Sequence, residues 1–206
     1  MSRRNARHGM RVRIAAAAAR IMAEDGIDDF GLAKRRAARV LGAPDTESLP
    51  ANEEVEAALR DYLALYQAQS HPERVEELRQ LALEAMESLE QFHPYLTGPV
   101  LSGLAGPYAS IDLQLFPESS KDVELFLLGR NIEYQAVDER RWAGDRAHDV
   151  AVITVDWKGV PMRLTLFDRR DERMAIKTTP TGRVAPRAGI GEVRDLLGSG
   201  DGIRAA

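Results

Sequence analysis

Apolar residues in the first part of the chain recur at intervals of three and four, which is the period of an amphipathic α-helix. Residues 9–25 show this spacing, and Gly26 follows them as a residue that commonly ends a helix. Three further helices are predicted on the same grounds, over about 29–41, 52–69 and 70–92. The pattern therefore predicts an all-helical region over residues 1–95.

The second part of the chain alternates between apolar and polar residues, which indicates β-strands with one buried face. Ile111, Leu113 and Leu115 occupy every second position in the clearest example. Further strands are predicted at Val100–Leu101, Ile132–Val137, Val150–Asp156 and Val160–Phe167. A helix that begins near Ser119 and a charged loop over Asp138–Asp149 complete the region 96–168.

These elements predict an α+β fold, in which the all-helical N-terminal half precedes a small mixed β-sheet with flanking helices. Residues 169–206 are polar and contain many Gly, Pro and Arg residues, so we expect a polar tail that is partly disordered. Within this tail, residues 190–197 form a short amphipathic stretch that is expected to dock on the rest of the protein.

Composition and charge narrow the class of protein. Hydrophobic residues make up 44% of the chain and charged residues 29%, as in ordinary globular domains. No apolar run approaches the roughly 20 residues that span a membrane, so we expect a cytoplasmic protein without membrane association. The chain contains no cysteine, and its four histidines lack the spacing of a zinc site.

The stretch Leu96–Phe116 combines features of a chemical site. An apolar pair precedes Ser102 and Gly103, a loop rich in Gly and Pro follows, and the strand with Asp112 comes next. Because side chains alternate along a strand, Asp112 is expected on the open face, opposite the buried Ile111 and Leu113. Small residues beside an open carboxylate allow a ligand to approach the backbone.

This arrangement resembles the core of the nucleotidyltransferase fold, the polymerase-beta-like superfamily, from the helix before Leu96 to Phe167. In that fold a strand ends in Gly-Ser, and the next strand carries the pair Asp-x-Asp. The resemblance implies that Ser102, Gly103 and Ser110 contact a nucleotide and that Asp112 is the catalytic carboxylate, which would hold Mg²⁺. Paired carboxylates in such sites hold divalent ions that stabilise the attacking and leaving oxygens.

The chain departs from the family pattern at two of the three carboxylate positions. Ser110 stands where the first carboxylate would be, and Arg163 lies on the open face of the strand that would supply the third. A single carboxylate holds Mg²⁺ poorly, because such sites depend on accumulated negative charge. We therefore expect a non-catalytic module that binds a nucleotide or a protein partner, with an active Mg²⁺-dependent nucleotidyltransferase as the alternative.

A third hypothesis concerns the basic N-terminal region. Residues 1–42 carry a net charge of +6, whereas the whole chain carries −4. The two helices predicted around Gly26 are similar to the opening of a TetR-type repressor, and the second one carries Lys34, Arg35, Arg36 and Arg39. This helical hairpin could bind nucleic acid through those residues, although an acidic, Pro-bounded loop follows where a recognition helix would stand. The sequence gives no oligomeric state.

Overall fold

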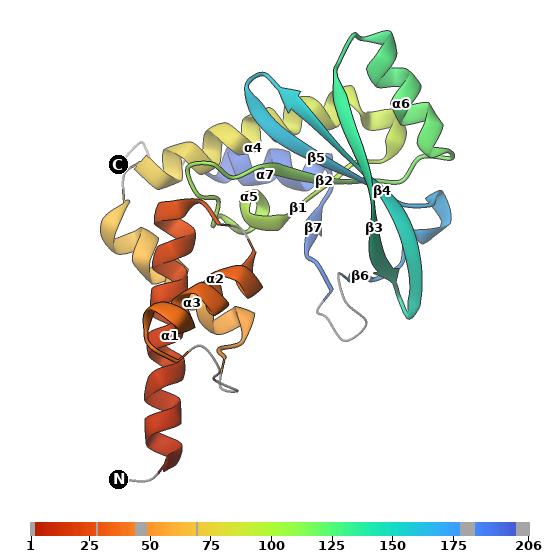
Figure 1. Ribbon diagram of the computed structural model, residues 1–206. Coiled ribbons are helices and arrows are strands. Elements are labelled where there is room, and N and C mark those ends of the chain that lie inside the picture. Colours follow the sequence, from red (N-terminus) through yellow and green to blue (C-terminus); the bar gives the residue numbers. More distant parts are fainter. Residues whose placement is uncertain (1–2, 28, 44–48, 69, 178–183, 201–206) are drawn as a thin grey trace. The chain divides into compact units, whose positions relative to one another are not determined.

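The computed structural model describes residues 3–27, 29–43, 49–68, 70–177 and 184–200 (Figure 1). The chain divides into two compact units. Met1–Arg74 and Leu104–Ala109 form the first unit, and Val75–Gly103 and Ser110–Ala206 form the second. Across the described part of the chain, no helix is both long enough and apolar enough to cross a membrane.

The first unit is built from helices α1 (Arg3–Asp25), α2 (Phe30–Val40), α3 (Asn52–Tyr66) and the start of α4 (Ser70–Ser88). The helices expected from the 3.6-residue period are thus confirmed, with shifted ends. Their buried faces are rich in alanine, which lets helices pack closely. The core of this unit contains Ile14, Ala18, Ala19, Met22, Ala33, Ala37, Val55, Leu59 and Leu63.

The second unit contains a seven-stranded mixed sheet in the order β6-β3-β4-β5-β2-β1-β7. The central strands are β1 (Tyr95–Thr97), β2 (Ile111–Leu115), β4 (Arg146–Trp157) and β5 (Val160–Leu166). β2 runs antiparallel to β1 and parallel to β5, whereas β4 is antiparallel to β5. The expected combination of helices with a mixed sheet is therefore confirmed at this level.

Helices supply apolar faces to the core of this unit. α6 (Ser120–Gly129) begins after Ser119, whose side chain accepts from the Lys121 N–H as expected for an N-cap. α4 is connected to α7 (Ile190–Gly200) by an ion pair of 2.8 Å between Glu87 and Arg194. The helices bury Leu78, Ala82, Ala85, Met86, Val123, Leu127 and Val193.

The segment expected to be a charged loop, Asp138–Asp149, is a β-hairpin, so that prediction is wrong. β3 (Tyr134–Ala143) pairs continuously with β4, from Tyr134 opposite Val155 to Ala143 opposite Arg146. Charged residues are tolerated in these strands because many of their side chains are exposed. Gly144 turns the chain with φ = 60°.

The strand expected at Val100–Leu101 is also wrong. These residues belong to a short helix, α5 (Gly98–Ser102), which has Pro99 in its first turn and is ended by Gly103 with φ = 72°. Proline favours the first helical turn, where its missing N–H is not needed. The strand of this region is β1, which ends at Thr97 immediately before the helix.

The predicted polar tail contributes to the sheet in its described part, which corrects the expectation for residues 169–206. A 3₁₀ turn, η2 (Arg169–Asp171), leads to β6 (Ile176–Lys177), which pairs with β3. β7 (Arg187–Ala188) pairs with β1, and the Ala185 N–H donates to the Ile176 carbonyl at 2.9 Å. The amphipathic stretch 190–197 lies within α7, as expected. Residues 178–183 and 201–206 lie outside the described residues.

Candidate functional site around Asp112

Asp112 lies in the second position of β2, between two strands. The register places it opposite Thr97 of β1 and opposite Arg163 of β5. Its neighbours on either side along the strand, Ile111 and Leu113, are fully buried, whereas Asp112 itself is partly exposed. The alternation along this strand predicts the partial exposure of Asp112, but Gln114, two residues further on the same face, is buried.

The carboxylate of Asp112 approaches the start of α5 closely. A Cβ atom placed on Gly98 would lie 2.6 Å from Asp112 Oδ2, which is closer than atoms of this kind approach. Gly98 also has φ = 73°, a conformation that side chains other than glycine adopt at a cost. Both observations favour glycine at this position, and the Asp112 side chain lies against the turn from β1 into α5.

The charges beside Asp112 alternate in sign. Arg163 Nη2 lies 3.0 Å from Glu139 Oε1, and Glu139 also contacts the guanidinium of Arg141. Within the residues that the structure describes, Asp112 belongs to no group of three or more His, Asp and Glu whose ligand atoms converge. The position beside Asp112 where a further carboxylate would support Mg²⁺ carries an arginine, and that cation opposes metal binding.

Ser102 and Gly103, expected to contact a nucleotide, lie at the other end of α5, about 6 Å along its axis from Gly98. Ser102 Oγ donates to the Pro99 carbonyl at 3.3 Å, and the Gly103 N–H also bonds to that carbonyl. These groups close the helix, and Ser110 is partly exposed immediately before β2. A role in nucleotide binding stays a prediction for all three residues.

Arg79 of α4 fixes the end of α5. Its guanidinium donates to the carbonyls of Val100 and Leu101 at 3.1 and 2.8 Å. These carbonyls lie at the C-terminal end of the short helix, where backbone acceptors lack partners within the helix. Burial of the side chain lowers the pKa of Arg79. The support of α5 by a residue of a distant helix was not visible in the sequence.

The four basic residues proposed for nucleic-acid binding lie on α2, and their surroundings differ. Lys34 Nζ donates to the Pro50 carbonyl at 3.0 Å and to Asn52 Oδ1 at 2.7 Å, and burial lowers its pKa. Arg36 lies 3.0 Å from Asp25 in an ion pair. Arg35 and Arg39 are exposed and lie one helical turn apart. Binding of nucleic acid by this helix stays a prediction.

Comparisons with family models, with curated proteins and with solved structures returned no match for this chain.

Proposed function

We propose that the second unit is a nucleotidyltransferase-like module that binds a nucleotide without transferring a nucleotidyl group. The single observation that carries this proposal is the register of Asp112 with Arg163, because it places a cation where metal-dependent transfer needs a carboxylate. With one carboxylate and an arginine beside it, the site lacks the accumulated negative charge that holds a pair of divalent ions.

Support for the nucleotide as ligand comes from the order of elements around β2. β1 ends at Thr97, α5 begins at Gly98, β2 carries Asp112, and α6 precedes the parallel neighbour β5 in the chain. The resemblance to the nucleotidyltransferase fold implies a glycine at the end of the first strand, and Gly98 fits this position better than Ser102–Gly103. In this proposal Arg163 contacts phosphate, whereas Asp112 orients the turn at Gly98.

Calorimetric titration with ATP, GTP, CTP and UTP tests the proposal, in the presence of Mg²⁺ and in the presence of EDTA. We expect at least one nucleotide to bind in EDTA, and Arg163→Gln to weaken that binding about tenfold or more, as the loss of a charged hydrogen bond does. The matched control is Arg194→Gln, which removes an exposed arginine of α7 that pairs with Glu87 rather than with a residue beside Asp112.

Two outcomes would contradict the proposal. Binding that requires Mg²⁺ and is lost in Asp112→Ala would favour the active nucleotidyltransferase, and pyrophosphate release would then be measured with candidate acceptors. Absence of binding for all four nucleotides would leave a protein partner as the ligand of this module.

A further inference from the structure

A second group of chemically active side chains lies beyond the C-terminal end of β5, which carries Arg163 in its middle. His148 belongs to β4, Asp168 follows β5, and Asp171 ends η2. Each of them offers a ligand atom, and these atoms lie within 4.8 Å of one another. From Arg163 to Asp168 an extended chain covers about 16 Å, so this group is separate from the site around Asp112.

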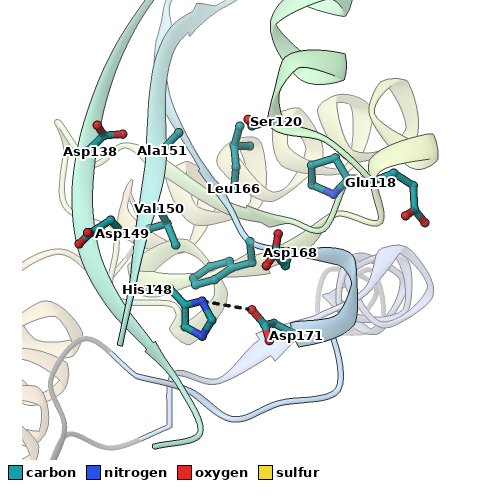
Figure 2. A pocket seen from close by; sticks show the side chains of 12 residues that line it. Glu118, Ser120, Asp138, His148, Asp149, Val150, Ala151, Leu166, Asp168 and Asp171 are labelled. Atoms are coloured by element: carbon teal, nitrogen blue, oxygen red, sulfur yellow. Dashed lines mark ion pairs between the residues drawn. The ribbon is translucent and has the colours of Figure 1, made fainter. Parts of the chain in front are cut away.

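The local backbone brings the two carboxylates together. The Asp171 N–H donates to the Asp168 carbonyl at 2.9 Å, which closes a 3₁₀ turn. Side chains three residues apart in such a turn lie above one another. Figure 2 shows His148 and Asp171 facing each other across the pocket, with Asp168 beside them.

The pocket around this group is acidic. It has a volume of about 260 Å³, and its charged lining residues are Glu118, Asp138, Asp149, Asp168 and Asp171. Three of these five carboxylates form ion pairs with arginines at 3.5 to 3.9 Å, and within the described residues two are left without one: the pairs are Arg170 with Asp168, Arg169 with Glu118 and Arg140 with Asp149. A concave surface with this excess of negative charge concentrates cations.

One buried atom of this cluster has no hydrogen-bond partner among the described residues. Asp171 is 8% exposed, and within the described residues its carboxylate makes no hydrogen bond and has one charged neighbour, His148 Nδ1, at 3.8 Å. His148 Nε2 is buried and also has no hydrogen-bond partner among the described residues. A buried imidazole nitrogen normally has a hydrogen-bond partner or a bound cation. His148 Nε2 is therefore the atom of this cluster that a further group would satisfy.

We propose that His148, Asp168 and Asp171 bind a divalent transition-metal ion of the Zn²⁺ or Mn²⁺ type. One imidazole nitrogen and two carboxylate oxygens suit such ions, whereas Mg²⁺ prefers ligands that are all oxygen. Metal–ligand distances near 2.0–2.2 Å place donor atoms up to about 4.4 Å apart, so small side-chain rotations bring the three ligands to an ion. Three protein ligands leave a coordination position for water or for a ligand in the pocket.

The test is calorimetric titration of the EDTA-treated, dialysed full chain with Zn²⁺ and, separately, with Mn²⁺. We expect one ion to bind, and His148→Gln, Asp168→Asn and Asp171→Asn each to weaken binding by about tenfold or more. Co²⁺ gives a second reading, because its visible absorption reports an ordered nitrogen and oxygen ligand set in the wild-type protein and its loss in the variants.

The chain offers a matched control. His93 Nδ1 lies 3.8 Å from Glu172, the same separation as in the pair of His148 and Asp171, but no third ligand from the described part of the chain converges there. Asn accepts the left-handed backbone of His93, which has φ = 50°, so His93→Asn should leave metal binding unchanged. Asp112→Ala should also leave it unchanged, which separates this proposal from the nucleotide site.

Absence of binding for both ions at millimolar concentration would overturn the proposal and leave an ion pair of His148 and Asp171. Loss of binding in His93→Asn would overturn it as well, by placing the ion elsewhere. Thermal unfolding followed by tryptophan fluorescence checks that each variant folds. Asp168 is about half exposed, so Asp168→Asn is expected to fold. This variant therefore decides the outcome even if Asp171→Asn fails to fold.

Discussion

Replacement of Gly98 by alanine tests the contact between Asp112 and the start of α5. Two costs combine: a left-handed residue other than glycine loses about 1–2 kcal/mol, and overpacking costs about 1–3 kcal/mol. The first applies because φ is 73°, and the second because the added Cβ would lie 2.6 Å from Asp112 Oδ2. We therefore expect Gly98→Ala to lower the free energy of unfolding by about 2–5 kcal/mol.

Gly103→Ala is the matched control for this substitution. Gly103 has φ = 72°, but a Cβ there would lie 3.5 Å from Arg79 Nη2, an ordinary contact. Its cost should be the conformational one alone, about 1–2 kcal/mol. In the background of Asp112→Ala the clash at Gly98 disappears, so Gly98→Ala should then cost about as much as Gly103→Ala.

Urea unfolding followed by tryptophan fluorescence is the suitable assay. Both tryptophans, Trp142 and Trp157, lie in β3 and β4, so the signal reports the sheet unit, whereas circular dichroism is dominated by the helices. Equal costs for Gly98→Ala and Gly103→Ala in the wild-type background would refute the close approach of Asp112. An unchanged cost of Gly98→Ala in the Asp112→Ala background would refute it independently.

Two further predictions concern hydrogen bonds from arginine side chains, those of Arg11 and of Arg79. The hydrogen bonds from Arg11 lower the pKa of Glu54, whose ordinary value is 4.5. The contribution of these bonds to the free energy of unfolding is therefore present above the ordinary pKa and is lost as the pH falls through the folded-state pKa. Glu54→Gln should lower the urea midpoint slightly at neutral pH, and the difference from the wild type, measured by circular dichroism, should vanish in acid; a constant difference would contradict this. Arg79→Met leaves the carbonyls of Val100 and Leu101 without their donor and should cost about 1–3 kcal/mol in fluorescence-monitored unfolding. Arg79→Lys should restore little of the lost stability, because one ammonium group does not reproduce the two hydrogen bonds of the guanidinium. Full recovery of stability in Arg79→Lys would contradict this expectation.

The sequence predicted the elements that carry a strong period. Helices α1 to α4 and α6 follow from apolar spacing, and β2 follows from the alternation of Ile111, Leu113 and Leu115. The same alternation correctly predicted that Asp112 is exposed in part, but it fails at Gln114, which is buried. These predictions succeed because burial of a stripe or a face leaves a direct trace in the order of residues.

The sequence did not predict the elements that form only by contact with residues distant along the chain. β6 and β7 have two residues each, too few to show a period, and they exist because β3 and β1 offer unpaired backbone groups. The charged hairpin was missed because its polar residues read as a loop, although Gly144–Asp145 is a recognised two-residue turn. α5 is only five residues long, and Pro99 was its one local signal.

The residues of the candidate sites also fall into those that the sequence could place and those that it could not. Asp112 and Arg163 could be placed because both lie on regular strands. The role of Gly98 depends on a close approach between segments, and the group of His148, Asp168 and Asp171 depends on β4 and the end of β5 being neighbours. Neither relation has a local signal, because each joins residues that are separated along the chain.

The two short strands also determine how the sheet meets other chains. A sheet edge with unpaired N–H and C=O groups is a template for intermolecular pairing and aggregation. β7 covers the outer side of β1, and β6 covers β3 at Trp142 and Ala143. In the described part of the chain, Tyr134–Arg141 of β3 has no strand on its outer side, and this segment carries Asp138, Glu139 and Arg140. Charges on an edge oppose the addition of another strand, so capping strands and charged residues together protect this sheet from self-association.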